Sequence, residues 1–360
     1  MATRAFGVGC IAFEWRESGS EDSEWGAAVT TALNGLANVR DVSVRTSGVF
    51  RSASEVLYEN TRGNTRNAFR PEPVHARIDF VIHVPRRIQD ELTHRLVAST
   101  AETFRVVVEY DLYGPVAFFT ALDGGPDDGA SGGVAAVRKF LEKNLTGRIE
   151  VTTVGPSPFH SDFFLRPGKE MDAPFALEIR RREGYYIHNF TYNTDEFESV
   201  DEALKELFDL IRREGVLFYS TIRRRNRRRE RAGAVAQRTE ELIAAQGTTG
   251  LRARVSRVFK GGGQARDLML RVIRAEFDAS QDRAWAEGLM SSHYAANTLP
   301  CMKEEIEANV SADDRDQLES ARLVADLVER GRGKEFEVVV IAAATLLGGL
   351  AGAIAALVAR

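Results

Sequence analysis

The residues best suited to chemistry form one short stretch near the middle of the chain. His160, Ser161 and Asp162 stand inside the segment 156–166, which also holds two prolines and three phenylalanines. If this histidine and carboxylate converged with a further partner, they could act as a general acid and base or bind a metal. The nearest such partner is His188, on a predicted strand. His160, Asp162 and His188 are therefore our candidate catalytic residues for a hydrolase or a nuclease.

The same stretch also has a purely structural interpretation. Phe159, Phe163 and Phe164 could clamp the segment on a sheet and leave His160 satisfied by local hydrogen bonds. His-x-Asp is a weak signature, because one sequence does not show which side chains converge. Both interpretations therefore stay open at this point.

No cofactor or metal motif accompanies these residues. His75, His83 and His94 lie on different predicted elements, and the two cysteines, Cys10 and Cys301, have neither zinc spacing nor a nucleophile motif. Two cysteines in 360 residues form no disulfide framework and favour a reducing, cytosolic environment. We predict no cofactor and no metal.

The strands and helices expected over residues 1–215 would position the candidate residues. Their order predicts an α+β domain with a mixed sheet that carries its helices mainly on one face. Strands and helices alternate, but the hairpin at 175–192 and the strand–strand turn at Gly114-Pro115 argue against a doubly wound parallel sheet. A loop is expected over 123–133, and Ser199 with Glu202 forms a capping box. Strands are predicted at 6–12, 41–45, 76–84, 104–112, 116–122, 148–154, 175–181 and 185–192, and helices at 22–39, 85–96 and 134–143.

Residues 216–336 are predicted to form a helical stalk or bundle, since the strand signal fades after residue 215. An Arg-rich segment at 223–231 carries seven arginines in nine positions. It could contact anionic lipid headgroups or nucleic-acid phosphates, or it could be a solvated or intraprotein helix balanced by acidic neighbours. The net charge of -4 and the lack of interleaved aromatic residues argue against nucleic acid as a partner. The seven residues are Arg223, Arg224, Arg225, Arg227, Arg228, Arg229 and Arg231.

The tail at 337–360 predicts a transmembrane anchor. From Val338 to Ala359 the only polar side chain is Thr345. As a helix these residues would be roughly 33 Å long, enough to cross a hydrocarbon core of about 30 Å. A buried core helix is the alternative, but an all-round apolar helix is unusual in a soluble domain.

Small residues recur every four positions within this predicted span. Such a stripe lets two helix backbones approach closely, so we expect the tail to associate with a second copy. The alternative is that alanine and glycine are simply common in such tails. The residues of the stripe are Ala344, Gly348, Gly352 and Ala356.

The charges around the span predict its orientation. Arg330, Arg332 and Lys334 precede it and Arg360 follows it, which favours a single-pass protein with residues 1–336 on the cytoplasmic side. The apolar run before Cys10 is shorter than that of a secretory signal, so we expect no signal peptide.

Three functions remain open on the sequence. The favoured one is a non-enzymatic sensor, adaptor or binding module that is held at the membrane and binds an unidentified protein or small molecule. The second is a membrane-anchored hydrolase or nuclease that uses the candidate catalytic residues. The third is a membrane-perturbing effector that oligomerises through its tail helix.

Overall fold

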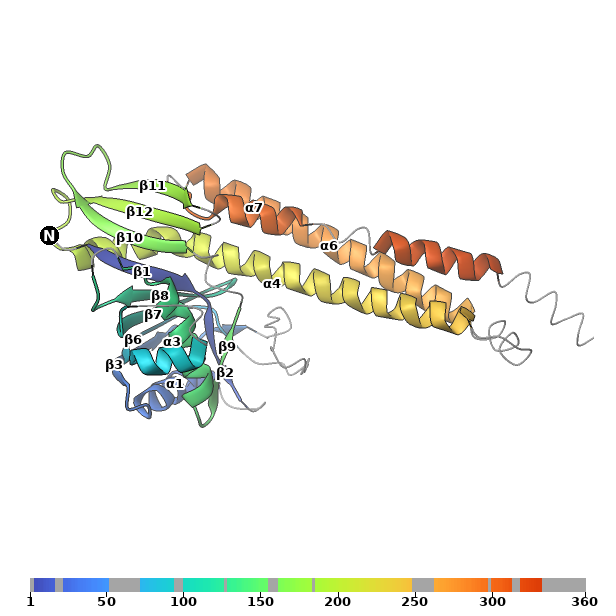
Figure 1. Cartoon of the computed structure of the whole chain (residues 1–360), viewed down its shortest axis with the longest axis horizontal. Helices are drawn as coiled ribbons and strands as arrows, with labels where there is room; N and C mark the ends of the chain where they lie inside the picture. Colours follow the sequence, from blue (N-terminus) through green and yellow to red (C-terminus); the bar gives the residue numbers. More distant parts are fainter. Residues whose placement is uncertain are drawn as a thin grey trace, which may run out of the picture. The chain divides into compact units, whose positions relative to one another are not determined.

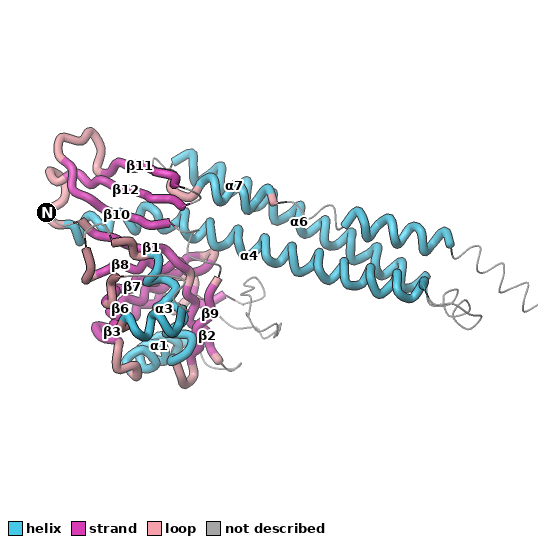
Figure 2. The backbone as a smooth tube through the Cα atoms, in the orientation of Figure 1, coloured by secondary structure: helices cyan, strands magenta, loops and turns pink. Residues whose placement is uncertain are grey.

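The computed structural model describes residues 3–16, 22–51, 72–93, 100–125, 128–154, 161–182, 185–247, 262–296, 299–312 and 318–331. They form two compact units. The first runs to Arg224 and also includes Ala286–Val310, and the second contains Arg225–Trp285 and the residues from Ser311 onward. Figure 2 shows that the strands lie in the first unit and that the second unit is helical.

A mixed sheet of eight strands forms the centre of the first unit. Its strands are β1 (Arg4–Gly9), β3 (Val39–Thr46), β6 (Ala76–His83), β7 (Thr103–Asp111), β8 (Gly114–Ala121), β10 (Ser161–Gly168), β11 (Phe175–Arg182) and β12 (Tyr185–Asn193). Their order is β11-β12-β10-β1-β8-β7-β6-β3, and the only parallel pair among them is β10 with β12. The predicted α+β class with a large mixed sheet is confirmed.

Two small sheets accompany the large one. They pair β2 (Ile11–Trp15) with β9 (Ile149–Thr153) and β4 (Phe50–Arg51) with β5 (Glu72–Pro73). The helices are η1 (Asp22–Glu24), α1 (Trp25–Asn34), α2 (Arg86–Thr93), α3 (Ser131–Asn144), α4 (Val200–Gly247), α6 (Gly262–Ala296) and α7 (Lys303–Ser311), and residues 318–331 are also helical (Figure 1).

Helices cover both faces of the large sheet. Phe208 of α4 stacks on Phe118 with ring centroids 4.2 Å apart, and it meets Phe6 at 5.2 Å. Side chains alternate along β1, so Gly7 points to the opposite face, where Val134 of α3 lies against it. The helices are therefore divided between two faces, whereas the sequence predicted them mainly on one.

The start of α3 differs from the sequence prediction. The sequence predicts a loop over 123–133, but the helix begins at Ser131 and includes Gly132 and Gly133. A side chain at Gly133 would collide with the ring of Phe104. Glycine at this position therefore serves close helix–sheet packing, not loop flexibility.

The long helix α4 runs through the point where the sequence placed a domain boundary. Its start matches the predicted cap, since the Ser199 hydroxyl accepts the Glu202 backbone N–H at 3.2 Å and the Glu202 carboxylate accepts the Glu198 N–H at 3.0 Å. The apolar residues at 216–222 continue the helix and are buried in the first unit. The boundary between the units falls between Arg224 and Arg225, within α4.

The second unit has its own apolar core. Residues of α4 and α6 pack there with the helical residues 318–331. Helix α6 runs without a break from Gly262 to Ala296. The core residues include Ala232, Val235, Leu242, Leu268, Val272, Leu318, Ala321 and Ala325.

The predicted membrane span lies beyond the described residues. Among the helices that the structure describes, none is long and apolar enough to cross a bilayer. Residues 332–360 are not among those residues, so the span and its small-residue stripe stay predictions.

Two glycines of α4 provide a matched test of the packing. A Cβ at Gly215 would lie 2.8 Å from Cγ2 of Val116, whereas nothing lies within 4 Å of a Cβ at Gly233. We expect Gly233→Ala to stabilise the protein by about 0.5–1 kcal/mol through helix propensity. Overpacking costs about 1–3 kcal/mol, so Gly215→Ala should show a net loss of stability. Urea unfolding of both variants is the measurement, and equal stabilisation by both would contradict this packing.

Candidate functional site

Asp162, on β10, faces the amino-terminal end of α3. One of its carboxylate oxygens accepts the backbone N–H of Ser131 at 3.1 Å, and the other accepts the Tyr185 hydroxyl at 2.6 Å. Burial and the hydrogen bond to this carboxylate raise the pKa of Tyr185 to about 12, so the phenol keeps its proton and donates it. Asp162 thus caps α3 from a neighbouring strand.

His188, on β12, makes its contacts on the other face of the sheet. Its ring stacks on Phe163 with centroids 4.6 Å apart, and its Nε2 lies 2.9 Å from the carbonyl oxygen of Cys301. Only 2% of the residue is exposed. Burial lowers the pKa of His188 to about 4. The imidazole is therefore neutral at pH 7 and donates from Nε2 to that carbonyl.

The structure does not bring Asp162 and His188 together. In the parallel pairing of β10 with β12, Asp162 lies beside Ile187, and Phe163 lies beside His188. Successive side chains of a strand point to opposite faces, so these two candidate residues lie on opposite sides of the sheet. His160 lies outside the described residues, and its part in a catalytic site stays a prediction.

A fully buried carboxylate organises the face on which His188 lies. Oε1 of Glu214, on α4, accepts the Tyr294 hydroxyl at 2.7 Å and the Met302 backbone N–H at 2.9 Å. Its Oε2 accepts the backbone N–H and the thiol of Cys301, both at 3.0 Å. We call these five residues, Glu214, Tyr294, Cys301, Met302 and His188, the Glu214 cluster.

The position of Glu214 suits a negative charge. Cys301 and Met302 directly precede α7, so their N–H groups belong to the start of that helix. The first N–H groups of a helix have no partner within it, and the helix dipole places partial positive charge there. The carboxylate therefore satisfies donors that would otherwise be buried without acceptors.

The thiol of Cys301 and the hydroxyl of Tyr294 keep their protons in the Glu214 cluster. Burial and the nearby carboxylate raise the pKa of the Cys301 thiol, and the same two causes raise the pKa of Tyr294. A nucleophilic cysteine needs the opposite, a lowered pKa and an accessible sulfur. The arrangement fits a structural role, in which these hydrogen bonds hold Tyr294, Cys301 and Met302 against α4 and the sheet.

Sequence reasoning missed this cluster. Glu214 and Cys301 are 87 residues apart, and Glu214 follows two arginines in a stretch that resembles any charged helix surface. Cys301 has no motif around it. No local pattern marks either residue, so only the tertiary structure reveals their contact.

The structure turns most of the Arg-rich segment toward protein. Arg223 donates to the carbonyl oxygen of Tyr113, and Arg231 forms an ion pair with Asp278 at 2.7 Å. The contacts of Arg223 and Arg231 fit the intraprotein interpretation for these two residues, and contact of the segment with anionic lipid stays a prediction. Arg223 and Arg228 are buried, Arg224, Arg225, Arg227 and Arg231 are partly buried, and Arg229 is exposed.

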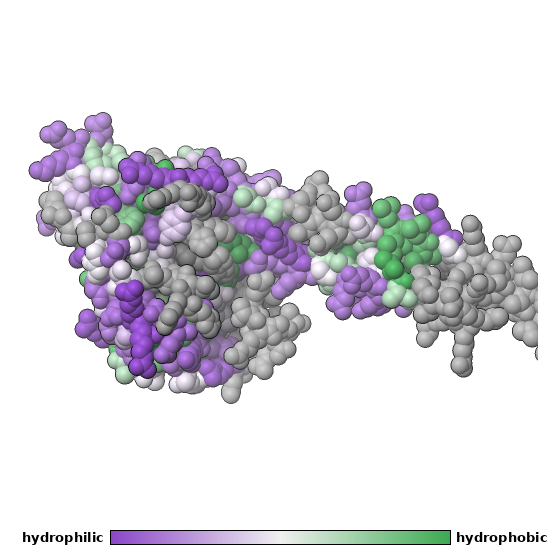
Figure 3. Space-filling model, viewed as in Figure 1, coloured by the Kyte–Doolittle hydropathy of each residue, from purple (hydrophilic) through white to green (hydrophobic). Residues whose placement is uncertain are grey.

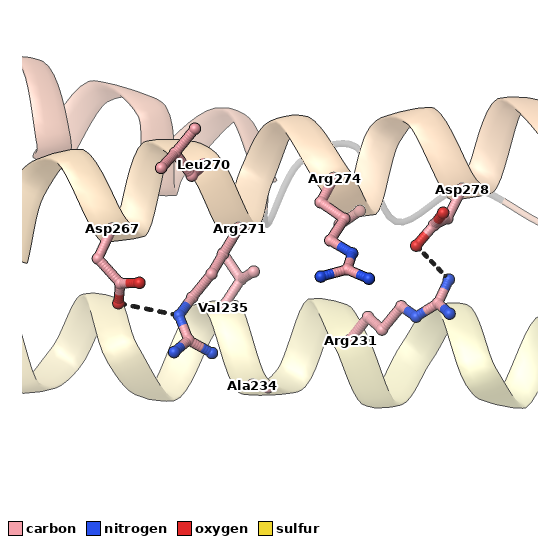
Figure 4. Close-up of a pocket in the computed structure, with 9 residues that line it drawn as sticks. Arg231, Ala234, Val235, Asp267, Leu270, Arg271, Arg274 and Asp278 are labelled. Atoms are coloured by element: carbon pink, nitrogen blue, oxygen red, sulfur yellow. Dashed lines mark hydrogen bonds and ion pairs between the residues drawn. The ribbon is translucent and has the colours of Figure 1, made fainter.

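An open groove of about 450 Å³ lies between α4 and α6 within the second unit. Asp267 accepts a hydrogen bond from Arg271 at 2.9 Å on one side, and the Arg231–Asp278 pair lies on the other. Figure 4 shows Arg274 reaching into the space between these two pairs. Apolar residues Ala234, Val235, Leu270 and Ala275 complete the lining.

Neither metal chemistry nor similarity to known proteins identifies this chain. Within the described ranges, no group of three or more His, Cys, Asp and Glu side chains could hold a metal ion. Comparison with protein-family models finds no match, and comparisons with curated proteins and with solved structures find none either.

The buried, neutral His188 should make stability depend on pH. The pKa of His188 is about 4 in the folded protein, below its ordinary value of 6.5, so the unfolded chain binds the extra proton more readily. The contribution of the neutral imidazole to the free energy of unfolding is complete above about pH 6.5. It is lost as the pH falls toward 4, which lowers the free energy of unfolding by roughly 3 kcal/mol. The variant His188→Gln removes the titration and keeps a side-chain donor.

Urea unfolding at a series of pH values between 7 and 4 measures this effect. His188→Gln should flatten the acid side of the stability profile by up to about 1.4 kcal/mol per pH unit. An unchanged slope would show that His188 is not held neutral by burial.

Proposed function

We propose that this protein is a single-pass membrane protein, anchored by residues 338–359, whose α+β unit acts as a non-enzymatic binding module at the membrane. One observation carries the proposal. The 22 residues Val338–Ala359 contain a single polar side chain, Thr345, and they follow closely on the helical residues 318–331.

The length and flanks of this stretch support a span. A helix of this length measures roughly 33 Å, against about 30 Å for the hydrocarbon core. Arg330, Arg332 and Lys334 precede it closely, and basic residues near a span favour the cytoplasmic side. The two units would then face the cytoplasm.

The chemistry of the first unit supports binding over catalysis. The thiol of Cys301 and the imidazole of His188 are buried, and both are engaged in hydrogen bonds that hold the fold together. Asp162 is engaged in capping α3. These groups are used to build a rigid unit, and a rigid unit presents a fixed surface to a partner.

Vesicle flotation tests the anchor. The full-length chain, incorporated into liposomes, should float with the lipid and should resist extraction by sodium carbonate at high pH. A variant that lacks 338–360 should stay in the soluble fraction. The double variant Leu346→Arg with Leu350→Arg should also fail to float, because a charge at the centre of a span costs roughly 2.5–3.5 kcal/mol.

A matched control separates membrane insertion from surface binding. Arg229→Glu with Glu230→Arg changes the exposed charges of α4 and leaves the tail intact, so this variant should float like the unmodified protein. Flotation that persists after deletion of 338–360 would overturn the proposal.

A further inference from the structure

The second unit exposes an unusual share of apolar side chains. Eleven large apolar residues of the described chain are exposed, and six of them belong to this unit, which is the smaller of the two. Five of the six follow helical spacing on two neighbouring helices. We call them the apolar stripe: Leu270, Ile273 and Phe277 of α6, with Leu323 and Leu327 of the helical residues 318–331.

The apolar stripe faces away from the core of its own unit. Exposed fractions of its residues range from 49% to 67%, while Leu268, Val272 and Leu318 on the same two helices are buried. An ion pair of 2.5 Å between Arg322 and Glu276 joins the two helices. Figure 3 shows a patch of hydrophobic side chains (green) on the second unit.

We propose that the apolar stripe is the contact surface for a second copy of this chain at the membrane, in a symmetric dimer. This inference rests on the proposed function, because the anchor supplies the orientation. Residue 331 ends the described helix that carries Leu323 and Leu327, and the span begins at Val338. Seven steps of chain reach at most about 25 Å, so each anchored copy holds its stripe near the membrane and in the same orientation.

The charges beside the stripe permit such self-contact. Arg266, Arg322 and Arg330 lie on the same helices as Glu319 and Asp326. A twofold symmetric contact brings a patch against itself, so a surface of one sign would repel its copy. The mixture of signs here avoids that repulsion.

The apolar stripe is too small to hold two free chains together, so a dimer depends on the membrane anchor. A stable interface between free proteins buries about 800 Å² on each partner, and five half-exposed side chains fall short of that area. Two chains confined to one membrane meet at a far higher effective concentration than free chains do. The apolar stripe should therefore associate between chains that are anchored in the same membrane.

Site-specific cross-linking of the full-length chain in liposomes tests the inference. Both native cysteines are buried, so a new surface thiol is the only reactive one among the described residues. With a short bifunctional maleimide, Leu327→Cys should give a covalent dimer. Glu240→Cys, at an exposed position of α4 in the same unit, is the matched control and should stay monomeric.

A second variant shows whether the apolar side chains themselves drive the contact. Phe277→Glu with Leu323→Glu, added to Leu327→Cys, should lower the yield of dimer by about tenfold or more. Both positions are exposed, and circular dichroism should confirm that the helices are retained. Liposomes with few chains per vesicle exclude random collision.

Each outcome decides the matter. If Leu327→Cys floats with liposomes but stays monomeric, the second copy is not the occupant and the inference fails while the proposed function stands. Equal cross-linking of Leu327→Cys and Glu240→Cys would also overturn it. If the chain does not float, the proposed function itself fails, which flotation reveals independently of any cross-link.

Discussion

The carboxylate of Glu214 is the interaction on which the organisation of the first unit depends. A fully buried charge is unfavourable unless donors surround it, and Glu214 has four. Three of these donors come from Cys301 and Met302, at the start of α7, and the fourth from Tyr294, near the end of α6. The chain must therefore return to the sheet after leaving it, which is why Ala286–Val310 belongs to the first unit.

The range of an interaction along the chain decides whether the sequence could predict it. The strands of the large sheet other than β10, the hairpin of β11 and β12 and the cap at Ser199 are encoded by local patterns, since alternation and capping act over a few residues. The sequence predicts no strand at β10 (Ser161–Gly168). The Glu214 cluster joins residues far apart in the chain, and no local pattern encodes it. The same limit applies to Asp162 and His188, because their separation follows from the register of two parallel strands, and the sequence does not reveal that register.

One wrong prediction has a clear physical cause, the override of local preference by packing. Glycine-rich residues suggested a loop at 131–133, but close contact with Phe104 requires a small residue there. Arg223, at the start of the Arg-rich segment, covers the turn at Gly114 within the first unit.

The Glu214 carboxylate holds residues 299–311 against α4. Hydrogen exchange of the full-length protein measures this directly. The amides of 299–311 should be protected in the unmodified protein. In Glu214→Ala they should exchange much faster, while β7 stays protected and the exposed control Glu206→Ala behaves like the unmodified protein. Rapid exchange of 299–311 in the unmodified protein, or unchanged protection in Glu214→Ala, would contradict the claim.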